Sequence, residues 1–339
     1  MSRTHVEGRT ESCVTRRALL QAGALAASCA AASNTLTAGA RVGAGPRARP
    51  DPGGQPRGAA PTIGMATTDF RTHTNAQLAQ ELAAEGVRVV QLFLTQTDSN
   101  YWRYNSRSDL AGLTAERCRE IADTYRSAGL AIHSIGVYTN LIHPDPAERQ
   151  ANLAYFEAMM QVGAHMNVRA FVTEAGHYYV PDKPAPRVEH HFQEEVWKMM
   201  VATGKELARM AERYEATVLF EPFFRHFLAS AKRTRVYLEE IGSPRLRVLL
   251  DPANLLEIND LGEMFDQLTP WIDCLHAKDR KLHVDRGVPA GQGDLDYPKF
   301  VTLATQRTPD APLILEYVGA KDYQQALAHL RQAIRQSSQ

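Results

Sequence analysis

Apolar runs of four to eight residues recur eight times along the chain, and longer segments with a helical repeat lie between them. The runs are rich in Val, Ile, Leu and Phe, which is typical of strands buried on both faces of a parallel sheet. The predicted strands are residues 62–67, 87–94, 131–138, 169–173, 216–220, 247–250, 272–275 and 312–315. Between them, for example at 75–85, 114–128, 147–164 and 194–214, apolar residues recur every three or four positions, as in amphipathic helices. Strands that alternate with helices predict a parallel α/β protein.

The even spacing of the strands favours closure into a (β/α)8 TIM barrel over an open sheet. Residues 61–339, which carry all eight strands, have about the length of such a barrel, for which ~250 residues are typical. Three helix starts carry capping signals: Thr114 precedes the second helix, Asp145 with Pro146 the third, and Asp296 the seventh. We therefore expect one barrel domain at residues 61–339.

Four of the later strands end at a side chain that can bind a metal. Glu221, Asp251, His276 and Glu316 close the runs Val-Leu-Phe-Glu, Val-Leu-Leu-Asp, Cys-Leu-His and Leu-Ile-Leu-Glu. The carboxyl ends of barrel strands meet on one face, where catalytic residues lie. Three carboxylates and an imidazole packed together are costly unless a cation lies between them. The pattern favours a metal site, and the alternative is four separate polar residues that cap strands.

The first 40 residues indicate an export signal rather than part of the fold. Arg16 and Arg17 precede an Ala-rich apolar run, which is followed by Ala38-Gly-Ala40. This order resembles a bacterial twin-arginine signal cleaved after Ala40, which predicts a periplasmic or secreted protein. The alternatives are a Sec signal, a lipoprotein site at Cys29, or a disordered basic tail. The run is too short for stable insertion in a membrane after cleavage.

Composition narrows the classes of function. Residues 41–60 are rich in Pro, Gly and Arg without an apolar period, which predicts a disordered linker. The formal net charge is zero, so the chain lacks the basic stripe expected of a nucleic-acid-binding protein. The four cysteines form no CxxC pair, which argues against a disulfide framework and against a thiolate zinc site.

Aromatic and polar residues gather in loops that follow the predicted strands. Residues 98–104 include Trp102, and residues 176–179 include His177. Aromatic rings beside polar groups suit the C–H faces of sugars, so Trp102 and His177 are candidate substrate contacts, as is Arg225 just after Glu221. The alternative is that the rings pack the loops onto the barrel rim and that His177 has a structural hydrogen bond.

Lys278 lies two residues after His276, and the period of a strand puts both side chains on one face. Its ammonium is predicted either to hold an oxyanion or a substrate hydroxyl, or to form a salt bridge with Asp279 or with a ligand glutamate. His133 and Glu174 are also expected near the strand ends of this face, where a structural hydrogen bond is the commoner role for a histidine.

The strand-end motifs together resemble the xylose isomerase-like TIM-barrel superfamily, in its sugar phosphate isomerase/epimerase branch. The resemblance extends from about Thr62 to the end of the chain and is carried by Glu221-Pro222, Asp251-Pro-Ala-Asn254, His276-Ala-Lys278-Asp279, Gly291-Gln-Gly293-Asp-Leu-Asp296 and Glu316. It implies one divalent ion held by Glu221, Asp251, His276 and Glu316. Mn²⁺ is expected first, with Mg²⁺, Co²⁺ or Zn²⁺ as alternatives.

Two positions depart from the pattern of that branch. Asn254 stands where many relatives have a histidine, which disfavours a multi-metal nuclease and leaves Asn254 as a candidate substrate contact. Phe227 stands where some ketose epimerases carry an additional glutamate, which weakens the match to that subgroup.

The resemblance implies that Glu221 and Glu316 act as facing proton donors and acceptors. The leading prediction is a metal-dependent isomerase or epimerase of a sugar or keto-sugar, working by α-proton abstraction through a metal-stabilised enediolate. Export and the lack of a Gly-rich phosphate loop favour an unphosphorylated substrate. The alternatives are a lyase or dehydratase acting on a keto-sugar or keto-glycoside, and a carbohydrate-binding barrel without chemistry. A homo-oligomer is left open.

Overall fold

The computed structural model describes residues 60–178, 188–284 and 286–337. The predicted export signal at residues 1–40 and residues 41–59 of the predicted linker at 41–60 lie outside the described residues. Among the described residues, no helix is both long and apolar enough to cross a membrane.

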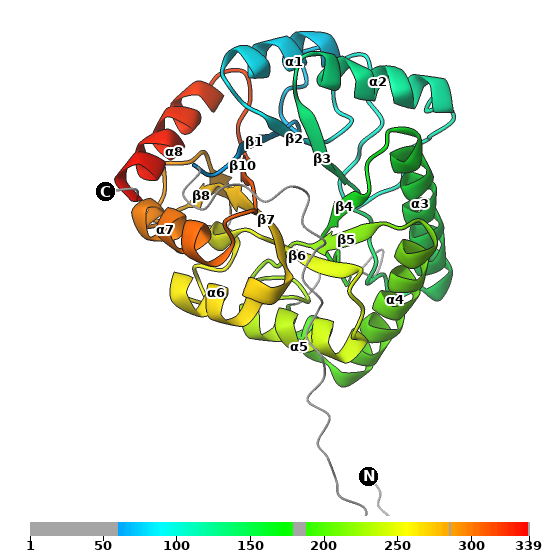
Figure 1. The fold of residues 1–339 in the computed structure, drawn as a ribbon. Helices are drawn as coiled ribbons and strands as arrows, with labels where there is room; N and C mark the ends of the chain where they lie inside the picture. Colours follow the sequence, from blue (N-terminus) through cyan, green and yellow to red (C-terminus); the bar gives the residue numbers. More distant parts are fainter. Residues whose placement is uncertain (1–59, 179–187, 285, 338–339) are drawn as a thin grey trace, which may run out of the picture. The chain divides into compact units, whose positions relative to one another are not determined.

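Eight parallel strands close into a barrel, which confirms the predicted fold class (Figure 1). Their order around the barrel is β1-β10-β7-β6-β5-β4-β3-β2, with β2 returning to β1. The strands are β1 (Ile63–Ala66), β2 (Val89–Leu92), β3 (Ala131–Gly136), β4 (Ala170–Thr173), β5 (Thr217–Phe220), β6 (Leu246–Leu250), β7 (Ile272–Ala277) and β10 (Leu313–Leu315). Each lies within two residues of its predicted bounds, because the apolar runs are buried on both faces as expected.

A helix follows each barrel strand and packs on the outside of the barrel (Figure 1). The helices are α1 (Asn75–Ala84), α2 (Ala115–Ser127), α3 (Pro146–His165), α4 (Glu194–Arg213), α5 (Ala231–Ile241), α6 (Leu261–Leu268), α7 (Tyr297–Arg307) and α8 (Tyr323–Ser337). Short 3-10 segments are η1 (Val188–Phe192), η2 (Pro252–Asn254) and η3 (Thr269–Trp271). The three predicted caps are confirmed: the side chains of Thr114, Asp145 and Asp296 each accept a hydrogen bond from a backbone N–H in the first turn.

Side chains that point into the barrel form a small core beneath its mouth. This core includes Phe93, Tyr138, Leu249 and Ile314, all buried. Gly136 makes room for Phe93, since a Cβ at residue 136 would lie 2.3 Å from the ring. Phe93 and Tyr138 therefore form the floor on which a site at the barrel mouth rests.

His133 lies away from that mouth, so its expected position was wrong. Its Nε2 is 3.3 Å from Oδ1 of Asp273, and Arg247 reaches the same carboxylate at 3.3 Å. Asp273 and Arg247 are each the second residue of their strands, and His133 is the third of β3. The three side chains therefore form a structural cluster near the amino ends of the strands.

A short antiparallel hairpin follows β7 and lies beside the barrel mouth. It pairs β8 (Asp279–Arg280) with β9 (Gly287–Val288). The carboxylate of Asp279 accepts backbone hydrogen bonds from Arg280, Gly291 and Leu295, at 2.8, 3.1 and 3.0 Å. A Cβ at residue 293 would lie 2.2 Å from Oδ1 of Asp279, so the turn requires Gly293. Asp279 is thus the centre that holds the hairpin and its following turn together.

Candidate active site

The four predicted metal ligands come together at the barrel mouth. Glu221, Asp251 and Glu316 directly follow β5, β6 and β10, and His276 lies one residue before the end of β7. One potential ligand atom from each residue lies within 4.8 Å of all the others. The Nδ1 atom of His276 is 3.3 Å from Oε1 of Glu221, 3.7 Å from Oδ2 of Asp251 and 3.4 Å from Oε2 of Glu316.

The donor atoms of this quartet fit a divalent cation. Oδ2 of Asp251, Nδ1 of His276 and Oε2 of Glu316 are buried, and within the described part of the chain none of them has a hydrogen bond of good geometry. Lys278 forms ion pairs with two of these oxygens, but three carboxylates packed around one imidazole still favour a further cation between them. Carboxylate oxygens with one imidazole suit ions such as Mn²⁺, Mg²⁺ and Zn²⁺. The quartet is therefore a candidate metal centre.

A buried glutamine orients the imidazole toward the centre of the quartet. Nε2 of His276 is 2.8 Å from Oε1 of Gln91, and Nε2 of Gln91 donates to Oγ of Ser134 at 3.3 Å. An amide oxygen only accepts hydrogen bonds, so Nε2 of His276 carries a hydrogen, and Nδ1 can direct a lone pair at the ligand position once a metal displaces its proton. Gln91 was not among the predicted site residues, although a polar residue inside the apolar strand Val-Val-Gln-Leu was a signal.

Replacing Gln91 by Leu is expected to weaken metal binding by about 10- to 100-fold, because the tautomer and ring orientation of His276 are no longer fixed. Calorimetric titration of the folded variant with Mn²⁺ measures this change. Ser134→Ala is the matched control, since it removes only the bond at the far side of Gln91, and its affinity stays close to that of the wild type. Equal affinities in Gln91→Leu and wild type would contradict the assigned role.

A lysine and an asparagine link the three carboxylates of the quartet. Nζ of Lys278 lies 2.6 Å from Oδ2 of Asp251 and 3.0 Å from Oε2 of Glu316, and it donates to Oδ1 of Asn254 at 2.9 Å. Nδ2 of Asn254 donates to Oε1 of Glu221 at 2.8 Å. Of the two predictions for Lys278, the structure contains the salt bridge to a ligand glutamate, and Lys278 also lines the cavity above the quartet.

The charges of the quartet shift the pKa values of its two glutamates in opposite directions. Burial, followed by the nearby Glu316 carboxylate, raises the pKa of Glu221. Burial also opposes ionisation of Glu316, but His276 and Lys278 outweigh it and hold the pKa of Glu316 well below its usual range. Two carboxyl groups whose pKa values are pushed apart are suited to different roles in proton transfer.

Metal affinity is expected to increase with pH. Burial alone would lower the pKa of His276, but the carboxylates of Glu316, Glu221 and Asp251 outweigh it and raise that pKa well above the usual value. Below that pKa, a metal ion must displace the proton on His276, so affinity rises by about tenfold per pH unit. Titrations with Mn²⁺ at several pH values, in buffers of different ionisation enthalpy, measure affinity and proton release together. A pH-independent affinity with no proton released would contradict this expectation.

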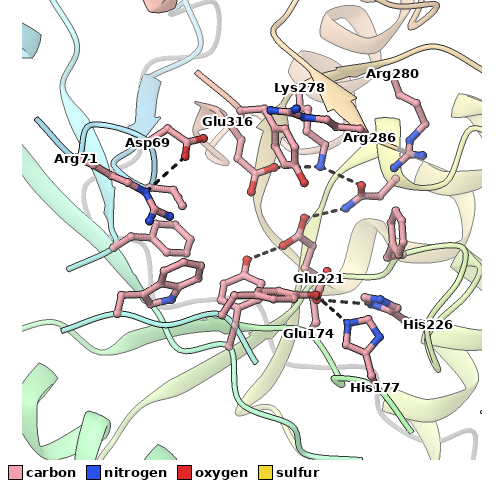
Figure 2. A pocket seen from close by; sticks show the side chains of 18 residues that line it. Asp69, Arg71, Glu174, His177, Glu221, His226, Lys278, Arg280, Arg286 and Glu316 are labelled. Atoms are coloured by element: carbon pink, nitrogen blue, oxygen red, sulfur yellow. Dashed lines mark hydrogen bonds and ion pairs between the residues drawn. The ribbon is translucent and has the colours of Figure 1, made fainter. Parts of the chain in front are cut away.

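A cavity of about 490 Å³ opens above the quartet (Figure 2). Trp102 and His177 line it, as do Asn254 and Lys278, so four of the candidate substrate contacts face one space. Aromatic rings form much of its wall: Phe93, Trp102, Tyr104, Tyr138, Phe223 and Tyr317. Trp102 packs edge-on against Phe93, with ring centroids 5.3 Å apart, so the same ring both anchors its loop and faces the cavity.

Arg225 does not reach this cavity, so its prediction as a substrate contact is not supported. Its side chain is exposed, with the guanidinium carbon 5.5 Å from the ring centre of Phe224, and its carbonyl accepts from Nδ1 of His191. The backbone turns after Glu221, because the N–H of Phe223 bonds to the carbonyl of Leu228. This turn directs residue 225 outward.

Further cationic and phenolic residues, which were not predicted from the sequence, line the cavity. Arg71, Arg280 and Arg286 lie around it in Figure 2, with Tyr317 beside Lys278. Tyr317 has φ of 58°, a conformation uncommon for a residue with a side chain. Arg280 lies two residues beyond Lys278 in an extended segment, so the same period of two was an available signal.

Comparisons with known proteins place these observations in a family context. The model of one family, described as xylose isomerase-like TIM barrel, matches residues 79–333. No curated protein matches the sequence. A 3-keto-D-glucoside 4-epimerase from E. coli is 18% identical, with 80% of this chain and 99% of that chain covered and a TM-score of 0.62.

Two further solved structures have the same fold. The probable 3-DHS dehydratase of petrobactin synthesis from Bacillus anthracis is 18% identical, covering 80% of this chain and 97% of that one, with a TM-score of 0.64. A xylose isomerase-like TIM barrel protein from Mycobacterium smegmatis, solved with magnesium, is 14% identical, covering 83% and 97%, with a TM-score of 0.59. At these identities the likeness establishes the barrel alone.

Proposed function

Because the chain belongs to the xylose isomerase-like TIM-barrel family, we propose that it is a divalent-metal-dependent enzyme that isomerises or epimerises an unphosphorylated sugar or keto-sugar. The observation that carries this proposal is that Glu221 and Glu316 line one cavity beside the candidate metal centre. Binding alone would not need two potential proton carriers beside a metal centre.

The two glutamates approach the cavity from well-separated strands. Glu221 follows β5 and Glu316 follows β10, and β6 and β7 lie between these strands in the barrel. Glu221 is held by the hydroxyl of Tyr138, which donates to its Oε2 at 2.6 Å. His276 and Lys278 favour the ionised form of Glu316, which suits it to accept a proton from substrate, and Glu221 on the other strand is the candidate donor.

A divalent ion in the quartet, Mn²⁺ by preference, would supply Lewis-acid stabilisation of the negative charge that develops next to the substrate carbonyl. A proton removed by one glutamate and returned to the other face of the same carbon gives epimerisation. A proton returned to the neighbouring carbon gives isomerisation. The aromatic walls at Trp102 and Tyr104 suit the C–H faces of a sugar ring.

Relatives with this fold support a carbohydrate or hydroxy-ketone substrate. The E. coli protein is named for epimerisation of a 3-keto-D-glucoside, and the B. anthracis protein for dehydration of 3-DHS. The dehydratase makes a lyase the second candidate here. The largely buried carboxyl of Glu174 in the same cavity favours that candidate, because a leaving oxygen needs a proton donor placed beside it.

Export by the twin-arginine route is part of the proposal. Its support is the Arg16-Arg17 pair ahead of an Ala-rich stretch, and a periplasmic or secreted address favours a substrate without phosphate. Recovery of the protein only from the cytoplasm of fractionated cells would contradict this part.

Proton NMR in D2O tests the proposed function. The full chain with Mn²⁺ is incubated with unphosphorylated ketoses and keto-glycosides, in parallel with the Glu316→Gln variant. Deuterium is expected to enter the carbon next to the carbonyl only with the wild type. Binding of these compounds without exchange on any of them would instead identify a carbohydrate-binding barrel.

A further inference from the structure

We propose that Glu174, held by Tyr104, is a general acid that protonates a leaving oxygen, so that the substrate is a keto-glycoside and the overall reaction is a β-elimination. The inference rests on the first step of the proposed function, removal of the proton next to the carbonyl, and it takes up the lyase that is the second candidate there. It adds a catalytic group that is not among the metal ligands.

Glu174 lies in the same cavity as the quartet but on another wall. It directly follows β4, next to β5, and its side chain is 12% exposed. In the view of Figure 2, Glu316 and Lys278 lie on one side of Glu221, and Glu174 with two histidines lies on the other. Both groups of side chains line the cavity, so a bound substrate can touch both walls.

Three polar side chains from three loops surround the carboxyl of Glu174. The hydroxyl of Tyr104, from the loop between β2 and α2, donates to Oε2 at 2.6 Å. The same hydroxyl is 3.2 Å from Nε2 of His177, and Nδ1 of His226 is 3.5 Å from Oε2 of Glu174. The rings of His177 and His226 meet edge to face, with centroids 4.4 Å apart. The carboxyl is thus fixed in position by a built cluster.

This cluster supplies little positive charge to the carboxyl. Burial lowers the pKa of His177 and of His226 to about 4, so both rings are neutral at pH 7. Burial raises the pKa of Glu174 to about 7, against the hydrogen bond from Tyr104 and the charge of Lys278, which lower it, while Glu316 and Asp251 raise it further. Lys278 is already paired with Asp251 and Glu316. Near neutral pH, Glu174 therefore passes readily between its protonated and ionised forms, as a general acid placed in this cavity must.

Epimerisation and isomerisation do not need this group, because Glu221 and Glu316 already carry the one proton that moves between carbons. An elimination also needs one base and one acid, but its acid must reach the leaving oxygen on the neighbouring carbon, and Glu174 lies on a different wall of the cavity from Glu316. In a 3-keto-glycoside, the base takes the proton from C2 and the electron pair of that C–H bond becomes the C1=C2 double bond. The C1–O bond breaks with its electron pair on the glycosidic oxygen, which takes the proton of Glu174. The products are an enone and an alcohol, and no oxidant or water is consumed.

The competing explanation is that Glu174 only anchors Tyr104 and its loop. In that case its loss would disturb every step alike. Loss of a general acid has a more specific effect. The rate of alcohol release falls most for leaving groups that need a proton, and the rate of the earlier exchange at C2 does not change.

The experiment compares wild type with Glu174→Gln on two substrates, methyl 3-keto-β-D-glucoside and p-nitrophenyl 3-keto-β-D-glucoside, with Mn²⁺ in D2O. Deuterium entry at C2 and release of the alcohol are measured together. In Glu174→Gln, we expect exchange to stay within about threefold, release of methanol to fall by roughly 10²- to 10⁴-fold, and release of nitrophenol, which departs without a proton, to fall by less than about tenfold. Glu195→Gln, an exposed change on α4, is the matched control.

Each other outcome is decisive. Equal losses on both glycosides, or loss of exchange as well, would overturn the general-acid role in favour of the anchoring role. A wild type that exchanges C2 but releases neither alcohol would overturn the elimination while leaving the proposed function standing. A wild type with neither exchange nor release of alcohol on any substrate would overturn the proposed function itself. If Glu174→Gln does not fold, Glu174→Asp and Tyr104→Phe are measured by the same comparison of leaving groups.

Discussion

Replacing Glu316 or Glu221 by Gln is expected to lower kcat/KM by about 10²- to 10⁴-fold or more, while the barrel stays folded. A glutamine cannot take up a proton at the site and is a weaker ligand than a carboxylate. The new amide has a different neighbour in each variant. In Glu221→Gln the new amide lies beside Nδ2 of Asn254, which donates to the native carboxylate, whereas in Glu316→Gln it lies beside Nζ of Lys278.

Steady-state kinetics on the substrate identified by deuterium exchange measure this effect, with near-UV circular dichroism to establish folding. Glu195→Gln serves as the control, because residue 195 is exposed in the first turn of α4 and makes the same chemical change far from the barrel mouth. Full activity of either site variant would contradict a role for the two glutamates in proton transfer.

Removal of the divalent ion is expected to have the second large effect. Turnover should fall by about 10³-fold or more, since several kcal/mol of charge stabilisation are lost and each ~1.4 kcal/mol is tenfold in rate. Binding should also be visible in stability. At a metal concentration of ~100 times Kd, the free energy of unfolding rises by about 2.7 kcal/mol.

Dialysis against a chelator, followed by addition of Mn²⁺, measures both quantities on the same sample by assay and by thermal melting. Asp251→Asn is the informative variant, because Oδ2 of Asp251 is one of the buried atoms that converge on the ligand position. It should lose the metal-dependent rise in melting temperature. Unchanged activity after complete chelation, or a rise in melting temperature that Asp251→Asn retains, would argue against the quartet as the metal centre.

The barrel and the convergence of the quartet could be predicted because both follow from local rules. A buried parallel strand is a continuous apolar run, and the residue that ends it must lie at the barrel mouth. Glu221, Asp251 and Glu316 satisfy that rule without reference to any loop. His133 does not follow this rule, because it is only the third residue of its strand. Its pairing with Asp273 could not be predicted from the sequence around either residue.

The rest of the site depends on loop conformations, which sequence patterns do not determine. Tyr104 and Glu174 are 70 residues apart, and only the folded loop after β2 brings the phenol onto the carboxyl. Arg225 was expected at the cavity because it follows Glu221 closely, but the turn that starts at Phe223 directs it outward. Gln91 could be recognised as a polar residue within an apolar strand. Its partner could not be predicted, because His276 is 185 residues away in the sequence.

The Asp279-centred hairpin has a consequence for how such an enzyme can diversify. Its internal hydrogen bonds converge on one carboxylate, and it brings Arg280 and Arg286 to the cavity. A segment with its own organising centre can be lengthened, shortened or exchanged between homologues while the catalytic strands keep their register. Transfer of residues 279–296 as one block is therefore the natural route to new substrate preferences on this scaffold. A change at Gly293 alone would prevent the segment from folding, because a side chain there would collide with the carboxylate of Asp279.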